Sequence, residues 1–415
     1  MTIERILTHP EAASAEAIQT AIDAFDGYGR LVLPAMDLLL DRGIELRSGI
    51  ELVGQGSATV LRKGPGRIYP MSGYHNYGMQ DVPLTSTTGL AVGMTVSVLD
   101  NLRLGFYETF ARITWIDGDW VGIDTGLSAD YTADQQPRLT TAYPMIFGHR
   151  ISNAAVRNLV LDGRREDQEI PMGGCRGGAI YLARSSATEV SGIRQYDYHG
   201  EGISFQMCRD VVVRESEFSR NSGNGIHPGA GSTNCLIDDC RSTGNEHSGF
   251  FFCVRANHIT VRNGVFEENG DGISIGTRDC HNLIEACRIH VNHGPGVLLR
   301  PDRSPVEVHS CRFQHCSIQG NAEREGGGQI VIAGPARDLE FSENDIQGDA
   351  HNPKPGILVE AATQKVHLRD NRFAGCDPDI RADERSLAHT TTSFECGHGE
   401  FIENRFRHLG YGVSP

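Results

Sequence analysis

The sequence predicts an all-β solenoid, a single chain wound as a right-handed parallel β-helix, and three observations support this. A glycine-rich phrase that ends in an aliphatic anchor recurs from Ile180 to Ile380, in steps of 23, 23, 24, 23, 24, 33, 27 and 23 residues. A column of asparagines precedes these anchors. Glycine accounts for 49 of the 415 residues, which suits a fold with a turn every few residues. A fixed period in this range indicates supersecondary units stacked on one another.

Each repeat carries the alternation of apolar and polar residues that is typical of strands rather than a helical stripe. The period is also too short for most repeats built from helical pairs. One coil of three short strands and three turns fits the length. The anchors are Ile180, Ile203, Ile226, Phe250, Ile273, Val297, Ile330, Ile357 and Ile380.

The asparagine column consists of Asn221, Asn245, Asn269 and Asn292, spaced 24, 24 and 23 residues apart. Asparagine at a turn can adopt the left-handed conformation and bond its neighbours one coil above and below. We therefore interpret the column as an internal ladder. The alternative is a row of amides that binds a ligand.

The ends of the solenoid and one insertion are also visible in the sequence. Ser14 to Phe25 reads as a short amphipathic helix with Ser14 as its N-cap, suited to covering an open end of the coils. Residues 72–140 interrupt the repeat with a strand pair around Asp117-Gly118 and hold both tryptophans. The predicted organisation is an N-terminal cap with the first coils (1–71), an inserted β subdomain (72–140), parallel β-helix coils (141–385), and a last coil with a C-terminal cap (386–415).

Two short motifs carry a resemblance to a known family. The helix motif Ala17-Ile-Gln-Thr-Ala-Ile22 and the turn Gly54-Gln-Gly56 resemble the N-terminal coil of the pectate-lyase-like superfamily of β-helix proteins. Pro34-Ala35-Met36 departs from the family pattern, which has a glycine there. Gly54-Gln-Gly56 is not a nucleotide-binding loop, because no third glycine and no helix follow.

The repeat phrases, such as Gly225-Ile-His-Pro-Gly229 and Gly272-Ile-Ser-Ile-Gly276, look like those of bacterial right-handed parallel β-helix repeat proteins. The resemblance implies the fold and, only loosely, carbohydrate-active chemistry, because the superfamily includes polysaccharide lyases, glycoside hydrolases, epimerases and fructosyl transferases. The adjacent aspartates of polygalacturonases and the calcium-binding carboxylates of pectate lyases are not recognisable. The fold therefore does not fix the reaction.

Composition restricts the partners. The net charge is −15 and only three lysines occur, which argues against binding to duplex nucleic acid but leaves room for an anionic sugar held by local arginines. The N-terminus has no apolar signal-peptide core, and no apolar run is long enough to span a bilayer, so we expect no membrane association and a cytoplasmic location. Trimerisation is an expectation from the resemblance alone.

The cysteines fit a reducing compartment better than a disulfide framework. Their number, eleven, is odd, and several occupy repeat positions, so we expect reduced, buried, stacked thiols. Cys311 and Cys316, with His309 and His315 nearby, fit no standard zinc spacing. We predict core packing there, and neither a metal nor a cofactor.

If the anchors point inward, the side chains that follow them point outward. The first outward column is polar or aromatic up to Ser274 and becomes apolar from Leu298, so the coils from Ile180 to Val297 form the predicted working face. This column contains Tyr181, Ser204, His227, Phe251, Ser274 and Leu298.

The outward residues predict a shallow, exposed trough with carboxylates and histidines on one rim and arginines on the other. Glu246, Asp271 and His227 are the candidate catalytic residues. Aromatic rings would stack on a sugar and arginines would hold its hydroxyls or a carboxylate. The candidate substrate-binding residues are Tyr181, Glu201, Ser204, Gln206, His247, Phe251, Arg255, Arg278 and Arg300. The alternative is that these arginines are ordinary solvated charges at the coil edge.

Three functional hypotheses follow. Glu246 and Asp271 lie on neighbouring coils about 4.8 Å apart, which allows the ~5–9.5 Å carboxyl separation of glycosidases. The first hypothesis is therefore acid/base cleavage or rearrangement of glycosidic bonds. The second is β-elimination on a uronate, with Arg278 or Arg300 neutralising its carboxylate and His227 as the base, or isomerisation or cyclisation of a sugar-like molecule. The third is a non-catalytic solenoid that binds glycans.

Overall fold

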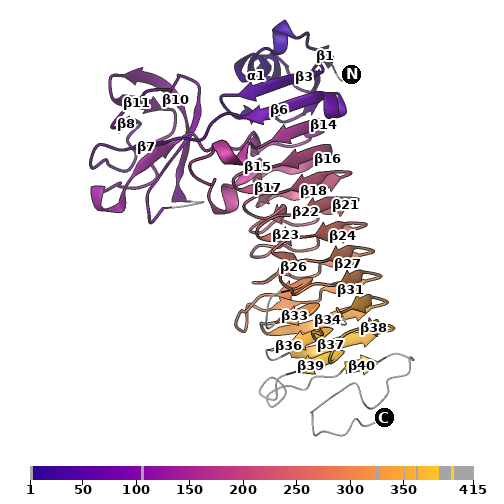
Figure 1. Ribbon diagram of the computed structural model, residues 1–415. Coiled ribbons are helices and arrows are strands. Elements are labelled where there is room, and N and C mark those ends of the chain that lie inside the picture. The colour runs from indigo at the N-terminus through magenta and orange to yellow at the C-terminus, as the bar shows by residue number, and fades with distance from the viewer. Residues whose placement is uncertain are drawn as a thin grey trace. The chain divides into compact units, whose positions relative to one another are not determined.

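The computed structural model describes residues 3–103, 107–323, 327–349, 351–360, 363–382 and 394–396 (Figure 1). The chain divides into two compact units. The first unit comprises residues 1–205 and 220–223, and the second comprises 206–219 and 224–415. Both consist of coils of parallel strands, so the predicted all-β parallel solenoid is confirmed.

In the first unit three stacks of parallel strands form the coils: β1–β2–β5–β14, β3–β6–β14 and β4–β13–β15. The long strand β14 belongs to two stacks and also pairs with β16. The coil strands are β1 (Ile3–Ile6), β2 (Gly29–Val32), β3 (Met36–Leu40), β4 (Ile44–Glu45), β5 (Ile50–Val53), β6 (Thr59–Lys63), β13 (Ile146–His149), β14 (Ala155–Asp162), β15 (Gly178–Ala183), β16 (Ser186–Tyr196) and β17 (Glu201–Gln206). Short 3-10 helices are η1 (Pro10–Ala12), η2 (Gly56–Ala58), η4 (Ala133–Gln135), η5 (Arg165–Asp167) and η6 (Gly174–Arg176).

The predicted capping helix is present as α1 (Ala15–Asp23). Ser14 caps it by accepting a hydrogen bond from the Ala17 amide at 3.1 Å, and the apolar face that contains Ile18 and Ile22 is buried. Gln19 exchanges two hydrogen bonds with the backbone of Glu45 in β4, of 2.8 and 3.1 Å. The helix thus satisfies backbone groups that the edge strand of a sheet would otherwise expose.

The insertion is an antiparallel sheet of six strands in the order β7–β12–β9–β10–β11–β8. It has its own apolar core, which includes Val96, Val98 and Tyr131. Asp117 pairs with Trp120, so the two-residue loop consists of Gly118 and Asp119, one position later than the predicted Asp-Gly turn. The strands are β7 (Ile68–Pro70), β8 (Asp81–Pro83), β9 (Thr95–Leu99), β10 (Thr109–Asp117), β11 (Trp120–Ile123) and β12 (Arg138–Thr140).

The second unit contains three further stacks of parallel strands. They are β20–β23–β26–β29–β33–β36–β39, β18–β21–β24–β27–β31–β34–β37–β40 and β19–β22–β25–β28–β32–β35–β38, and β30 also pairs with β34. The first of these stacks carries the predicted working face. Its strands are β20 (Ile226–Pro228), β23 (Ser248–Phe251), β26 (Asp271–Ile275), β29 (Val297–Leu299), β33 (Ile330–Ile332), β36 (Ile357–Val359) and β39 (Ile380–Ala382).

The remaining strands of the second unit form the other two stacks. They are β18 (Arg209–Arg214), β19 (Glu217–Ser219), β21 (Leu236–Asp238), β22 (Arg241–Thr243), β24 (Thr260–Arg262), β25 (Val265–Glu267), β27 (Leu283–Glu285), β28 (Arg288–His290), β30 (Val308–His309), β31 (Arg312–Gln314), β32 (Ser317–Gln319), β34 (Ala336–Ser342), β35 (Asp345–Gln347), β37 (Thr363–Arg369), β38 (Arg372–Ala374) and β40 (Phe394–Cys396).

The asparagine column is an internal ladder, as predicted. Asn245 donates through its backbone and side-chain nitrogens to Asn269 Oδ1 at 3.0 and 2.8 Å, and Asn269 donates to Asn292 Oδ1 in the same way at 3.0 and 3.1 Å. Asn292 continues the ladder to Asn321. All of them are buried, which excludes the ligand-binding alternative.

The expected left-handed conformation of these asparagines is wrong. The residue one position earlier adopts it instead, with φ of 65° at Gly244, 59° at Glu268 and 46° at Val291. This bend before each asparagine turns the amide side chain toward the interior, where it replaces the strand hydrogen bonds that a turn interrupts.

The ten cysteines with described side chains are free thiols, and six of them are buried. Burial raises the pKa of Cys235, Cys240 and Cys311 to about 12, so these thiols are protonated and unreactive at neutral pH. In the described part of the chain, no helix combines the length and apolarity needed to cross a membrane.

Candidate active site

The outward column of the second unit is stacked as the sequence predicts. Phe251 pairs with Ser274, Ser274 with Leu298, and Leu298 with Val331 on successive strands. The anchors before them, such as Phe250 and Ile273, are fully buried in the interior. Because side chains alternate along a strand, the Phe251 column lies on the opposite face of this stack.

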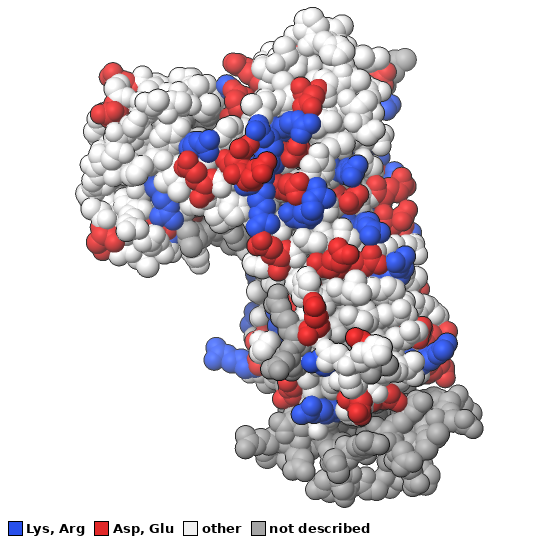
Figure 2. Space-filling view, in the orientation of Figure 1, with Lys and Arg blue, Asp and Glu red and all other residues white. Residues whose placement is uncertain are grey.

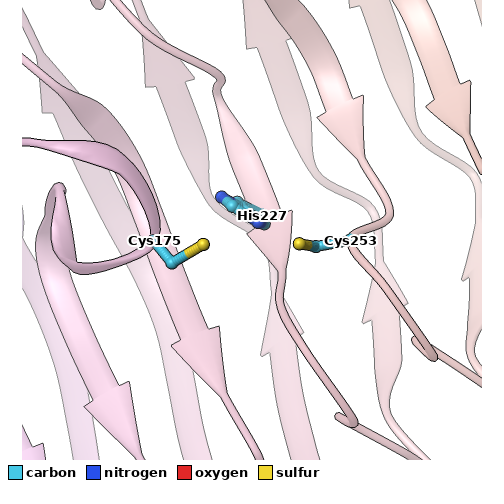
Figure 3. Close-up of side chains that lie close together, drawn as sticks. All are labelled: Cys175, His227 and Cys253. Carbon is cyan, nitrogen blue, oxygen red and sulfur yellow. The ribbon is translucent and has the colours of Figure 1, made fainter. Parts of the chain in front are cut away.

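Part of the predicted trough floor is buried rather than exposed. His227 is only 3% exposed, and Gln206 and Ser274 are 0% and 1% exposed. The prediction that His227 is an exposed, central histidine is therefore wrong. Figure 3 shows its side chain on β20 beside that of Cys253, and the His227 ring packs edge-on against Phe251 with centroids 5.0 Å apart.

Gln206 has a structural partner. Its Oε1 accepts a hydrogen bond from the Ala230 amide at 2.8 Å, and its side-chain amide occupies the space that a Cβ on Gly229 would fill. A buried amide that bridges two coils in this way is not available to a substrate. The predicted substrate-binding role of Gln206 is not consistent with this burial.

The same correction applies to two candidates in the first unit. Ser204 is fully buried and its hydroxyl donates to the carbonyl oxygen of Cys175 at 2.9 Å, while Glu201 is 6% exposed. The segment that contains η6 thus lies over the outward face at Ser204. Tyr181 remains half-buried. No repeat in the sequence indicates this covering segment, which is why sequence reasoning missed it.

Arg300 is held by internal contacts. Its guanidinium carbon lies 4.1 Å from the centroid of the Phe251 ring, and its nitrogens donate to Ser274 Oγ at 2.8 Å and to the Phe252 carbonyl oxygen at 2.6 Å. An added Cβ at Gly276 would lie 2.5 Å from Arg300 Nη2, so this glycine makes room for the guanidinium. Arg300 therefore stabilises the outward face around Phe251 and Ser274, and these donors are used within the protein rather than offered to a ligand.

Asp279 completes this cluster and was missed by sequence reasoning. Its carboxylate lies 3.7 Å from Arg300 and accepts hydrogen bonds from the amides of Ala256 at 2.9 Å and Gly276 at 2.8 Å. Burial raises the pKa of Asp279, while the two amides and Arg300 act in the opposite direction. The sequence gives little indication that Asp279 is buried, because an aspartate that follows an exposed arginine usually lies in a solvated turn.

One rim of the predicted trough carries ionisable groups on neighbouring coils. Glu246 and His247 are exposed, and Asp271 is half-buried. The Asp271 amide donates to the His247 carbonyl oxygen at 3.4 Å, and Ser248 pairs with Asp271. These contacts place the backbones of Glu246 and Asp271 about one coil spacing and one to two residues apart, roughly 6–8 Å. Their carboxyl groups can therefore reach the separation that two-carboxylate hydrolysis requires.

The other rim carries Arg255 and Arg278, both exposed. They occupy equivalent left-handed turns, with φ of 65° and 58°, and the Arg255 amide donates to the Thr277 carbonyl oxygen at 3.0 Å. Half-buried Phe251 lies on the strand between the two rims. The structure thus places Glu246, His247 and Asp271 at the start of strands β23 and β26, Arg255 and Arg278 after these strands, and Phe251 on β23. It buries His227 and Gln206, and it leaves Arg300 half-buried and held by internal contacts.

A further carboxyl in the first unit has an unusual environment. Glu108 is 4% exposed, and burial raises its pKa to about 7 despite the opposing charge of Arg176. Within the described residues its Oε1 has no hydrogen-bond partner. Strongly shifted carboxyls are typical of functional sites, although structural burial also produces them. Its position within the insertion, directly before β10, gave no sequence signal.

Two hollows lie away from these residues. One, of about 430 Å³ in the first unit, is lined by residues that include Tyr69, Tyr143 and Glu169. The other, of about 340 Å³ in the second unit, is lined by residues that include Lys354 and Arg381. Neither is lined by a predicted site residue. On the face drawn in Figure 2, basic and acidic side chains of the described residues are interspersed and form no continuous basic stripe.

The coil geometry agrees with the comparison against known families. The family model described as right handed beta helix region matches residues 146–253 and 230–373, which is more than half of the chain. The chain belongs to the right-handed β-helix family. No curated protein matches this β-helix protein in sequence.

Solved structures resemble this β-helix protein in fold at low identity. The mannuronan C-5 epimerase AlgE6 A-module of Azotobacter vinelandii has a TM-score of 0.63 and 15% identity, over 93% of this chain and 90% of that one. The AlgE4 A-module of the same organism has a TM-score of 0.59 and 15% identity, over 91% and 95%. ORF18 of Geobacillus virus E2 has a TM-score of 0.52 and 11% identity, over 91% of this chain and 58% of that one. At such identities the likeness shows the shared fold.

Proposed function

We propose that this β-helix protein is a carbohydrate-active enzyme that acts on an oligosaccharide or polysaccharide across the rims around Phe251. The observation that carries the proposal is the group of exposed Glu246 and His247 and half-buried Asp271 on adjacent coils, at the start of strands that lead past half-buried Phe251 to Arg255 and Arg278. A half-buried ring suits the apolar face of a sugar. Similar folds described as mannuronan C-5 epimerases add support for a polysaccharide substrate.

The reaction that we propose first is cleavage of a glycosidic bond by Glu246 and Asp271. One carboxyl group protonates the leaving oxygen, and the other acts as nucleophile or activates water. Asp271 is half-buried and lies within electrostatic range of Arg300, whereas Glu246 is exposed. Different surroundings of this kind favour different roles for the two groups.

The test uses the full chain and a panel of neutral and acidic polysaccharides. We expect new reducing ends without ultraviolet-absorbing products from the wild type, and a loss of turnover of 10²-fold or more in Glu246→Gln and in Asp271→Asn. Glu268→Gln, at an exposed glutamate on a neighbouring turn, is the matched control and should keep full activity. Full activity in both carboxyl variants would reject this mechanism.

The arginine rim favours a second candidate, a reaction at C5 of a uronate that yields either an unsaturated product or an inverted centre. Because His227 is buried, His247 is the histidine placed to abstract the C5 proton, and Arg255 or Arg278 would neutralise the carboxylate. This candidate predicts either ultraviolet-absorbing unsaturated products, which appear together with new reducing ends because elimination cleaves the glycosidic bond, or C5 inversion visible by NMR without new reducing ends. Arg278→Ala should then weaken binding of an acidic glycan and leave a neutral one unaffected. Binding without any turnover would indicate a non-catalytic glycan-binding solenoid.

A further inference from the structure

Three histidines and a cysteine meet on the turns that follow the working-face strands of the second unit. His258 lies between β23 and β24, Cys280 and His281 lie between β26 and β27, and His309 ends β30. They come from three successive coils. None of them belongs to the rims described above.

The coil register brings these side chains together. Cys280 and His309 form a parallel bridge, so they are neighbours in one column. The amide of His258 donates to the Cys280 carbonyl oxygen at 3.2 Å, and that of His281 donates to the His309 carbonyl oxygen at 3.3 Å. His258 and His281 share the left-handed conformation, with φ of 55° and 57°, and are neighbours in the next column. The four side chains thus occupy the corners of one small patch.

The side-chain contacts are close. One ligand atom from each of Cys280, His281 and His309 lies within 4.8 Å of the other two. The His258 and His281 rings are stacked, with centroids 4.9 Å apart and planes 7° apart, and the His281 and His309 rings meet edge-on at 5.4 Å. His258 is therefore adjacent to this group of three.

We propose that Cys280, His281 and His309, with His258 as an additional ligand, form a binding site for Zn²⁺ or a similar late first-row transition ion. Thiolate and imidazole are the donors that such ions prefer. Bonds of ~2.0–2.3 Å in a tetrahedral site place ligand atoms roughly 3.3–3.8 Å apart. Closing the gap from 4.8 Å needs a shift of about 1 Å, which rotation of the exposed His281 and His258 side chains can supply.

The surroundings are compatible with a cation. His309 Nδ1 lies 3.2 Å from Ser310 Oγ, and with Nδ1 as the donor the lone pair is on Nε2. The Cys280 thiol donates to Asn257 Oδ1 at 3.2 Å. Arg337 follows His309 in its column, but its charge is compensated by Glu307 at 3.4 Å and by Asp338 at 3.1 Å.

Ordinary side-chain stacking explains this group less well than a metal site does. In the asparagine ladder one residue type repeats, whereas the column of Cys280 and His309 changes chemistry at every coil, with Thr233 and Asn257 before them. The next column carries His258 beside Asn257, His281 beside Cys280 and Ser310 beside His309, so the four candidate ligands are gathered on three successive coils. A metal ion there would link three coils at an otherwise exposed turn.

The test is cobalt titration of the chelator-treated full chain, followed by absorbance. We expect a thiolate-to-cobalt band in the near ultraviolet that saturates at one ion per chain, and displacement of cobalt by zinc. Cys280→Ser should abolish this band, and His309→Gln should lower the affinity at least tenfold. Zinc should raise the melting temperature of the wild type and not that of His281→Gln. Circular dichroism of each variant verifies the fold, and His281 is exposed, so its replacement spares the core.

His315→Gln is the matched control, because His315 is also exposed on a left-handed turn of the same unit and pairs with Glu343 at 3.4 Å. It should bind cobalt as the wild type does. If Cys280→Ser, His281→Gln and His309→Gln all retain the wild-type band and affinity, the proposed site is wrong and the cobalt is bound by other thiols of the chain.

Discussion

The inward and outward columns of the same strands in the second unit behave differently. The inward anchors Phe250, Ile273 and Val297 are fully buried one after another, and the asparagine ladder repeats its hydrogen bonds from coil to coil. The exposure of the outward side chains does not repeat from coil to coil: His227 is buried, Phe251 is half-buried and Ser274 is buried. Inward positions have the same neighbours in every coil, whereas the burial of outward positions depends on segments that do not repeat. The predictions below test that distinction, from the largest effect to the smallest.

The largest effect should come from breaking the ladder at Asn269. Replacement by alanine removes the oxygen that accepts from Asn245 and the nitrogen that donates to Asn292 Oδ1 and to the Ser242 carbonyl oxygen. All three partner residues are buried. Because unsatisfied buried polar groups are costly, Asn269→Ala should lower the free energy of unfolding by about 3 kcal/mol. Chemical denaturation measures this change.

Asn263→Gly is the control for that substitution. Asn263 is exposed and has a φ of 55°, which glycine adopts readily, so the change should stay within about 0.5 kcal/mol. Equal destabilisation by both variants would show that the ladder is no more important than a surface asparagine.

An inward column also holds one charged group, Lys63 on β6. Its ammonium group lies over the Tyr143 ring at 3.9 Å and donates to the carbonyl oxygens of Gly64 and Thr141. Burial lowers the pKa of Lys63 to about 7, from an ordinary value near 10.5. Between these two values the unfolded chain binds more protons than the folded one, so raising the pH stabilises the fold and lowering it destabilises the fold.

We therefore expect the unfolding free energy of the wild type, relative to Lys63→Met, to rise by about 1.5 kcal/mol between pH 7.5 and pH 9. Taking the difference between the two proteins removes the contributions of all other titrating groups. Parallel pH profiles would mean that Lys63 keeps its proton in the folded protein, held by the two carbonyl groups and the aromatic ring.

The smallest effect concerns the bend before each ladder asparagine. Val291 holds a φ of 46° there and is exposed, although β-branched residues rarely adopt this conformation. Val291→Gly should stabilise the fold by about 1 kcal/mol, because it removes the strain. The reverse change at the equivalent position, Gly244→Val, should destabilise it by a similar amount. A loss of stability in Val291→Gly would show that the side chain contributes packing that outweighs the strain.

Sequence reasoning located the coils, the capping helix and the ladder, because each depends on a repeated or local pattern. Ser14 is a standard N-cap, and Asn245, Asn269 and Asn292 recur in register. It also placed Glu246 and Asp271 on adjacent coils. It failed for His227 and Ser204, since nothing in the repeat indicates that they are buried.

The order of residues along the chain determined which side chains stack on one another, because a coil of nearly constant length brings equivalent positions into register. Only the folded structure decided which of those stacked side chains meet solvent. That outcome depends on irregular segments and on pairs such as Arg300 with Asp279, whose contact arises from two coils closing around one glycine rather than from any periodic signal.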